Sequence, residues 1–280
     1  MTIGIIGLGL IGGSIAKDLK AHGEFEILGV DNNAEHNETA RALKIVDEIV
    51  GLTTLIQRSK VIILAFPVHS IAKNLPGLLD QLSMDKTIID VGSTKGDILK
   101  SIASHPMRSR FIAAHPLAGT EFSGPTAALR HLFSGKKNII CNADNSAEDA
   151  LEDAMQIFNI LGMETFFMNA DEHDKHLAYV SHLSHISSFV LSLTVQDIEK
   201  DEEQIFNLAG TGFASTVRLA KSNSKTWAPI FDANLEHVVK ALDHYQLRLN
   251  EFKSALLSRK MEDTERLIIE ANKIKQLIKN

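Results

Sequence analysis

The chain has 280 residues, enough for two domains or for one domain with a large extension. Hydrophobic residues make up 44% and charged residues 23%, ordinary values for a soluble globular protein, and the net charge of −6 disfavours nonspecific binding to nucleic acid or acidic membranes. The single cysteine, Cys141, excludes an intramolecular disulfide, and we expect a buried thiol in a cytoplasmic protein.

The N-terminus opens with the apolar and glycine-rich segment MTIGIIGLGLIGG. It has no basic start, and glycines interrupt the apolar run, so the pattern is not that of a signal peptide. No uninterrupted apolar stretch is long enough to span a bilayer. We therefore expect no association with a membrane.

Up to Asn169, short apolar runs rich in Ile and Val alternate with amphipathic segments. This alternation is typical of βαβ units and predicts a Rossmann-type α/β fold, with a doubly wound and mostly parallel sheet. The runs that predict strands are 2–7, 25–31, 61–67, 87–93, 111–116, 137–142 and 163–169.

After Ala170 the strand signals stop, and the pattern predicts an all-helical domain over 170–280 behind a nucleotide-binding domain over 1–169. Within this part, the predicted helix over 185–195 is apolar nearly all round, which predicts deep burial against other helices. Two further predicted helices have apolar residues at steps of three and four. In the first helix these residues are Leu235, Val238, Leu242, Tyr245, Leu249, Phe252 and Leu256, and in the second they are Leu267, Ala271, Ile274 and Ile278.

A GxGxxG motif follows the first predicted strand and opens a helix. In this motif the first glycine makes a tight turn, the second admits a pyrophosphate to the backbone, and the third lets helix and strand pack closely. The free N–H groups at the helix start then favour a phosphate. The expected cofactor-binding residues are Gly7, Gly9, Leu10, Ile11 and Gly12.

Asp31 ends the second predicted strand, about 20 residues beyond the glycines. An acid in this place accepts hydrogen bonds from the adenosine ribose hydroxyls and repels a 2′-phosphate, so it favours NAD over NADP. The alternative is a glycine-rich turn beside an ordinary surface aspartate.

Polar residues follow two later strands, Ser93 in DVGSTKG and His115 in IAAHPLAGTE. Because ligands of open α/β sheets bind beyond the carboxyl ends of the strands, we expect both side chains to face the nicotinamide. Ser93 has the alternative role of N-cap for a helix beginning near Gly96. Lys95 is expected to be a solvated surface charge.

Four histidines occur in DEHDKHLAYVSHLSH. His182 and His185 share a helix face, whereas His173 lies nine residues before His182, near the opposite face of a regular helix. The HxxH spacing, with no cysteine and no HExxH glutamate, is poor for a metal, and we expect none. A hydrogen-bonded core imidazole is the alternative role for each histidine.

Arg218 lies among small and apolar residues, near the only tryptophan, Trp227. A planar guanidinium in such a setting suits bidentate binding of a carboxylate. A structural ion pair is the alternative.

Together these pieces resemble the prephenate/arogenate dehydrogenase family over nearly the whole chain. The matching segments are the glycine motif with Asp31, DVGSTKG, HPLAGTE, HDKHLAYVSHLSH, GFASTVRLA and Trp227. The resemblance implies oxidation of prephenate by NAD with loss of carbon dioxide, giving 4-hydroxyphenylpyruvate in tyrosine biosynthesis. It also implies a homodimer formed through the helical domain, and we expect no additional regulatory domain within the 280 residues.

The resemblance further implies roles for single residues. His115 would hydrogen-bond the ring hydroxyl of the substrate, Ser93 would assist it next to the cofactor, and Arg218 would hold the ring carboxylate. Further substrate contacts are implied for Thr120, Glu121, His173, His182, His185 and Trp227. The family often has Gly-Phe-Arg-Asp before the arginine, whereas this chain has Gly212, Phe213, Ala214 and Ser215, so an ionic contact near the pocket or dimer interface is missing.

As a general base, neutral His115 would take the hydroxyl proton while hydride leaves, and we expect a pH–rate profile that rises near neutrality. Three other functions stay open from the residues. They are an arogenate dehydrogenase, a β-hydroxyacid dehydrogenase, for which no convincing catalytic lysine is seen in the helical part, and an NAD-sensing regulator without turnover.

Overall fold

The computed structural model describes residues 1–199 and 205–277. By its internal contacts the chain forms two compact units, Met1–Leu235 and Glu236–Asn280. The predicted domain boundary between residues 169 and 170 lies inside the first unit, at the point where the sheet ends and the helices begin, and it stays a prediction.

The first unit is built on one eight-stranded sheet, in the order β3-β2-β1-β4-β5-β6-β7-β8. All neighbouring strands are parallel except β6 and β7, so the predicted Rossmann-type fold is confirmed. Only β3 was not predicted, because two residues are too short to show a periodicity. The strands are β1 Thr2–Ile6, β2 Glu26–Val30, β3 Glu48–Ile49, β4 Val61–Leu64, β5 Thr87–Asp90, β6 Phe111–Pro116, β7 Lys137–Cys141 and β8 Glu164–Met168.

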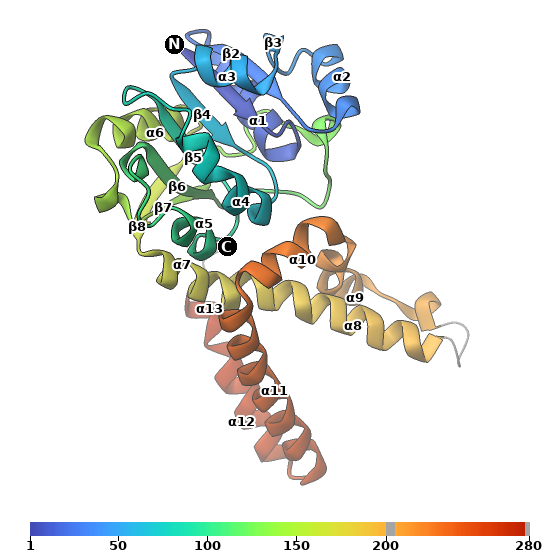
Figure 1. Ribbon diagram of the computed structural model, residues 1–280. Helices are drawn as coiled ribbons and strands as arrows, with labels where there is room; N and C mark the ends of the chain where they lie inside the picture. Colours follow the sequence, from blue (N-terminus) through green and yellow to red (C-terminus); the bar gives the residue numbers. More distant parts are fainter. Residues whose placement is uncertain (200–204, 278–280) are drawn as a thin grey trace. The chain divides into compact units, whose positions relative to one another are not determined.

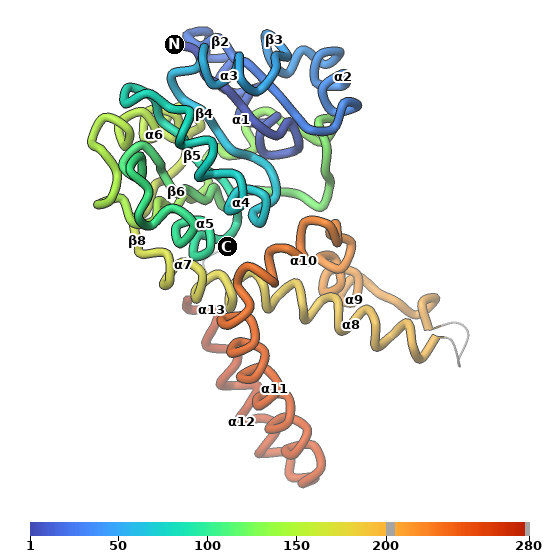
Figure 2. The backbone as a smooth tube through the Cα atoms, in the orientation of Figure 1, coloured from blue at the N-terminus to red at the C-terminus, as the bar shows by residue number. Residues whose placement is uncertain are grey.

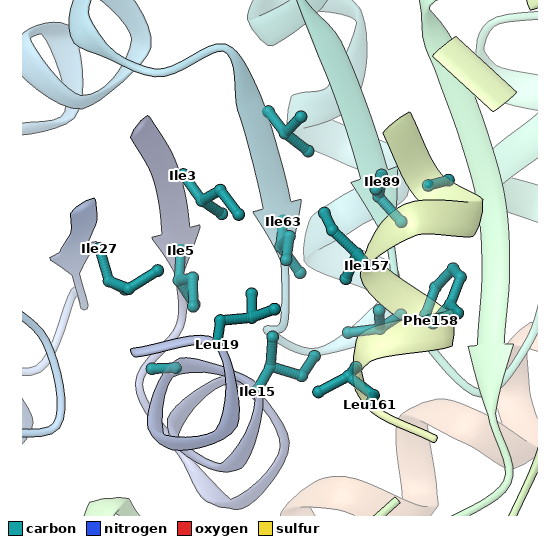
Figure 3. Packing of buried hydrophobic residues seen from close by; sticks show 14 of the residues in the cluster. Ile3, Ile5, Ile15, Leu19, Ile27, Ile63, Ile89, Ile157, Phe158 and Leu161 are labelled. Atoms are coloured by element: carbon teal, nitrogen blue, oxygen red, sulfur yellow. The ribbon is translucent and has the colours of Figure 1, made fainter. Parts of the chain in front are cut away.

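Two apolar clusters pack on the two faces of this sheet, because successive side chains of a buried strand point to opposite faces. One face is covered by α1 Leu10–His22 and α6 Glu148–Ile160, and Figure 3 shows Ile15, Leu19 and Ile157 against strand residues such as Ile5. The other cluster takes residues from three further helices, α3 Leu52–Arg58, α4 Val68–Leu79 and α5 Gly96–Ser101. A further short helix, α2 Ala34–Ala42, follows β2.

Cys141 ends β7 inside the second cluster, as expected from its apolar surroundings. Burial raises the pKa of its thiol to about 12. A neutral thiol of this kind packs as a small hydrophobic side chain rather than acting as a nucleophile.

The described part of the chain after β8 contains helices and their connections but no strand (Figure 1). Residues 170–199 form one continuous rod, in which a single π-helical turn, Ala178–His182, interrupts the α-helix. The helices of this part are α7 Ala170–Leu177, α8 Leu183–Glu199, α9 Thr211–Thr216 and α10 Ser224–Ala233.

The second compact unit is a helical hairpin. It holds most of α11 Leu235–Leu257, followed by α12 Met261–Asn272, which run side by side in Figure 2 and are linked by Arg248 and Glu270. The predicted helix from Leu235 to Leu256 is confirmed. The pattern from Leu267 onward is instead divided between α12 and a short α13 Ile274–Leu277, and Ile278 lies outside the described residues.

One expectation about burial is wrong for the single chain. The apolar helix α8 keeps large side chains at the surface, with Val190 52% and Leu193 60% exposed. Its described neighbours cover only one side of it, although the sequence is apolar nearly all round.

Across residues 1–199 and 205–277, no helix combines the length and the apolar character that a membrane crossing requires.

Candidate active site

The glycine motif has the backbone geometry that a dinucleotide-binding loop requires. Gly7 follows β1 with φ of +96°, and a Cβ atom there would lie 2.4 Å from the carbonyl oxygen of Ala65. A Cβ on Gly12 would lie 2.0 Å from the carbonyl oxygen of Gly7. Gly9, in contrast, has no heavy atom within 4 Å of its added Cβ. The turn and the close packing therefore need glycine, and the space above Gly9 is open to a ligand.

The helix that follows offers unpaired donors to this space. No side chain caps the N-terminus of α1 at Gly9, so the first-turn N–H groups, including those of Leu10 and Ile11, are available to an anion. The residues present thus fit the pyrophosphate of a dinucleotide.

Asp31 lies directly after β2, and its carboxylate is held against the glycine loop. Its two oxygens accept hydrogen bonds from the backbone N–H groups of Leu8, at 2.8 Å, and Asn33, at 2.9 Å. The Nδ1 atom of His36 lies 3.4 Å from one of them. These contacts fix the acid at the end of β2, beside the open space over Gly9, and its oxygens retain lone pairs for further donors.

Ser93 and His115 lie at the same edge of the sheet, because β5 and β6 are parallel neighbours in which Asp90 pairs with Ala113. The side chain of Ser93 is half-buried and has no hydrogen bond within the described part of the chain. The N-cap position of α5 is taken by Lys95, so the alternative role of Ser93 as the cap of that helix is wrong.

Lys95 is completely buried, which corrects the expected solvated charge. Its ammonium group donates to both carboxylate oxygens of Asp90, at 2.7 and 2.6 Å, and to the carbonyl oxygen of Ala114, at 2.7 Å. Three donors thus have three acceptors, which offsets the cost of burying the charge. The ion pair joins the ends of β5 and β6 immediately before His115.

His115 begins a chain of buried hydrogen bonds. Its Nδ1 atom lies 2.8 Å from Nε2 of His173, whose Nδ1 lies 2.7 Å from Oδ1 of Asp174. Burial lowers the pKa of His115 well below its ordinary value, and His173 and the positive charge of Lys95 shift it in the same direction. His115 is therefore neutral at pH 7, the protonation state that a general base requires.

The π-helical turn changes how the helix histidines are arranged. Asn234 donates through its amide nitrogen to the carbonyl oxygen of Asp174, at 2.7 Å, and the same nitrogen lies 3.2 Å from Nδ1 of His182. His173 and His182 are both buried, and their imidazoles are close enough for their charges to interact. Burial lowers the pKa of His182 to about 4. π turns add residues to one turn and often occur at functional sites.

His185, Trp227 and Arg218 form a second group. The rings of His185 and Trp227 are stacked with centroids 3.4 Å apart, and Nδ1 of His185 donates to the carbonyl oxygen of Ser181 at 3.0 Å. Burial lowers the pKa of His185, with a smaller contribution from Arg218. Arg218 is exposed and has no ion pair among residues 1–199 and 205–277, so the alternative of a structural ion pair is not realised.

Thr120 and Glu121 lie on the segment after β6, where a surface hollow has a volume of about 590 Å³. This segment returns to the cofactor helix, because Leu129 donates its N–H to Oγ of Ser14 at 2.9 Å. It therefore connects the end of the His115 strand with the glycine-rich loop. No hydrogen bond or ion pair within the described residues joins Thr120 or Glu121 to the helix histidines. The hollow is lined by Thr120, Glu121, Phe122, Ser123, Thr126, Ala127 and Leu129.

Sequence reasoning missed Asp174 and Asn234. The segment HD at residues 173–174 is a usable signal for Asp174, because a carboxylate beside a histidine is a common partner for its ring. Asn234 has no signal, since an asparagine at the end of a helix is ordinary. Among the residues that the structure describes, no group of three or more His, Cys, Asp or Glu side chains is arranged to hold a metal ion.

Two family models match the chain. The nucleotide-binding domain of prephenate dehydrogenase matches residues 15–166, and its dimerization domain matches residues 169–272. The chain belongs to the prephenate dehydrogenase family. The resemblance seen in the sequence is thereby confirmed, and the predicted class, an oxidoreductase with a nicotinamide nucleotide, agrees with this membership.

Relatives in the family carry different substrate names. A prephenate dehydrogenase of Lactococcus lactis subsp. cremoris is 32% identical over 97% of this chain and 76% of its own length. The structure of the Aquifex aeolicus prephenate dehydrogenase with hydroxyphenyl propionate and NAD+ is 30% identical, with a TM-score of 0.88 over 99% of this chain and 97% of that one. The Synechocystis arogenate dehydrogenase is 27% identical, with a TM-score of 0.80 over 99% of both chains. This family member is therefore similar both to enzymes named for prephenate and to an enzyme named for arogenate.

Proposed function

We propose that the chain oxidises prephenate with NAD+ and releases carbon dioxide, giving 4-hydroxyphenylpyruvate and NADH. The observation that carries this proposal is a neutral, buried imidazole, His115, at the end of β6, at the same edge of the sheet as the dinucleotide loop after β1. A neutral imidazole can accept the proton that a ring hydroxyl must lose as its carbon becomes a carbonyl carbon. The prephenate names of the Lactococcus and Aquifex relatives support this substrate.

The cofactor-binding residues are proposed from the geometry of the loop. Gly7, Gly9 and Gly12, with the N–H groups of Leu10 and Ile11, would hold the pyrophosphate, and the fixed carboxylate of Asp31 would accept from the ribose hydroxyls. Bound NAD+ accepts the hydride from the carbon that bears the ring hydroxyl.

The reaction needs one proton acceptor and regenerates it. Nε2 of His115 takes the hydroxyl proton as hydride leaves, and a ring carbonyl forms. The bond to the ring carboxylate then breaks, its electron pair restores the aromatic ring, and the negative charge reaches the former carbonyl oxygen. The His115 imidazolium returns the proton to that oxygen. The base is neutral again at the end of the cycle, with carbon dioxide as the leaving group.

Substrate orientation is assigned to the guanidinium of Arg218, which is exposed and has no ion pair with any residue that the structure describes. It would bind the ring carboxylate, since a charge-assisted bidentate pair combines energy with a defined geometry. We propose that Ser93 hydrogen-bonds the ring hydroxyl beside the nicotinamide. Contacts to the rest of the substrate are proposed for Thr120, Glu121, His182, His185 and Trp227.

Arogenate is the second candidate substrate, supported by the name of the similar Synechocystis enzyme. It carries an amino acid in place of the keto acid side chain, so it would be distinguished by groups that contact the side chain rather than the ring. The deciding experiment follows absorbance of the reduced nicotinamide with prephenate or arogenate and with NAD+ or NADP+. No reduction with either substrate, by a folded protein that binds NAD+, would favour the sensing role over the enzyme.

We also propose a homodimer formed through the helical part. The match to the dimerization domain supports it, as do the exposed apolar side chains of α8 and α11, such as Leu193 and Leu249. Large apolar patches on a single chain are typical of interaction surfaces.

A further inference from the structure

His173 is completely buried between His115 and Asp174, away from the position expected of a substrate contact. We infer that His173 and Asp174 are positioning residues, which hold His115 in the tautomer that leaves its Nε2 atom unprotonated. This inference rests on the proposed function of His115 as a base, and it concerns two residues that touch neither the ring hydroxyl nor the cofactor in that mechanism.

Asp174 is the fixed end of the chain. Its oxygens accept hydrogen bonds from the backbone N–H groups of Lys95, at 2.9 and 3.2 Å, and Gly96, at 2.7 Å, at the start of α5. Burial by itself would raise the pKa of Asp174, but the hydrogen bonds from His173 and Gly96 lower it below the ordinary value. Asp174 is therefore an ionised carboxylate, which can accept hydrogen bonds but cannot donate them.

This acceptor determines where both imidazole protons lie. Because Asp174 can only accept, Nδ1 of His173 carries a proton, and Nε2 of this neutral ring is a lone pair. That lone pair can only accept, so Nδ1 of His115 carries the proton in the 2.8 Å contact between the two rings. The remaining atom of His115, Nε2, is then unprotonated. A neutral histidine in the opposite tautomer would present an N–H group to the substrate and could not act as a base.

The neighbouring groups also keep the imidazole of His115 neutral before the reaction. His173, the ammonium of Lys95 and His182 each lower its pKa, and the carboxylate of Asp174 contacts the far side of the His173 ring. After proton transfer, the Nδ1–H group of the His115 imidazolium still donates to His173, and the negative charge of Asp174 polarises this bond favourably. Asn234 secures the geometry, since its amide donates to the backbone carbonyl of Asp174.

The substitution Asp174→Asn tests the inference with little change in shape. The N–H of Lys95 lies within hydrogen-bonding distance of both oxygens, at 2.9 Å from Oδ1 and 3.2 Å from Oδ2, whereas the N–H of Gly96 reaches only Oδ2, at 2.7 Å. An amide oxygen in the place of Oδ2 keeps both backbone donors, and this orientation directs the NH₂ group at His173. His173 would then expose a lone pair at Nδ1 and donate from Nε2, which puts the proton of His115 on the wrong nitrogen. We expect kcat to fall about 10²–10⁴-fold, with KM for prephenate changed less than about threefold.

The tautomer itself is read without any substrate, by two-bond ¹⁵N–¹H spectra of the histidine-labelled protein. The expected result is a proton on Nδ1 of His115 in the wild type and on Nε2 in Asp174→Asn. A His115 proton that stays on Nδ1 in a folded Asp174→Asn protein would overturn the inference. This readout is independent of turnover: an inactive wild type with the expected tautomers would refute the proposed function alone.

A pair of His173 variants keeps the inference testable if Asp174→Asn does not fold. The amide of His173→Gln can accept from His115 and donate to Asp174, so kcat should stay within about tenfold of wild type, whereas His173→Leu offers no acceptor and should lose about 10²-fold or more. Glu172→Gln, an exposed charge change on the same helix, is the control and should leave kcat unchanged. Equal activity of the Gln and Leu variants would contradict a role in fixing the tautomer.

Discussion

Lys95 and Asp90 form an ion pair with both side chains completely buried under the end of the strand that carries His115. The same ammonium group donates to the carbonyl oxygen of Ala114, one residue before the histidine. A buried positive charge at this place opposes a second positive charge on the imidazole. The ion pair therefore contributes both to the structure of the strand end and to the neutral state of His115.

The first prediction concerns the strength of this ion pair. Lys95→Met leaves the Asp90 carboxylate buried without its cation, and we expect the free energy of unfolding to fall by about 3–5 kcal/mol. In the double variant Asp90→Asn with Lys95→Met, the amide oxygen can still accept from the N–H of Gly92, so most of this loss should be recovered. Urea unfolding of the single and double variants measures both values. A double variant no more stable than Lys95→Met contradicts the assigned pairing.

The second prediction is the pH dependence of catalysis. A base acts in its deprotonated form, so a pKa lowered by burial extends activity toward lower pH. The rising limb of kcat/KM should consequently lie below the ordinary histidine pKa of about 6.5, rather than near neutrality as expected from the sequence. His115→Asn should lose this limb and about 10²–10⁴-fold in kcat, with NAD binding nearly unchanged. His176→Asn, on the exposed side of α7, is the matched control. Near-native hydride transfer by His115→Asn in stopped-flow measurements would remove His115 from the mechanism.

Cofactor choice gives the third prediction. Asp31→Ser removes a negative charge that repels a 2′-phosphate and an acceptor for the ribose hydroxyls, so the preference for NAD+ over NADP+ should narrow by about 10–100-fold. Initial rates with the two cofactors measure the ratio. Because Asp31 also accepts from the backbone of Leu8, thermal unfolding must show that the variant keeps its fold. A wild type that uses NADP+ as readily as NAD+ would show that Asp31 has been misassigned.

The fourth prediction concerns Arg218. Loss of one charge-assisted pair costs about 1.5–3 kcal/mol, so Arg218→Ala should raise KM for prephenate by about 10–150-fold. Its melting temperature and its affinity for NAD+ should stay close to wild type, since the guanidinium has no ion pair in the described part of the chain. Lys221→Ala, in the same short 3-10 segment, controls for loss of positive charge. Unfolding or loss of NAD binding in Arg218→Ala would assign the residue a structural role.

The dimer is the fifth prediction. Light scattering at micromolar concentration should give twice the chain mass of 30.8 kDa. Leu193→Lys, which places a charge on the exposed apolar side of α8, should shift the protein toward monomer. Met84→Lys changes an equally exposed apolar residue of the nucleotide-binding part and should not. A stable monomeric wild type contradicts the dimer.

Much of the nucleotide-binding fold could be predicted from the sequence, because the information is local. Each strand of four or more residues is an apolar run between helical patterns. The glycine motif, six residues long, indicates the tight turn, the open space for a ligand and the close packing of helix and strand. His115 could be placed at a strand end for the same reason. The two-residue strand β3 and the π-helical turn Ala178–His182 could not, since neither leaves a periodic signal.

The environment of each polar group was decided by the tertiary structure. Lys95 looks like any surface lysine in sequence, and only the approach of Asp90 and Ala114 in three dimensions makes its burial possible. His115 meets His173 across 58 residues of chain, and Asp174 caps the start of α5 across 79. Sequence spacing determined which residues could do chemistry, whereas protonation states and hydrogen-bond partners depended on desolvation and on contacts between distant segments, which no local pattern encodes.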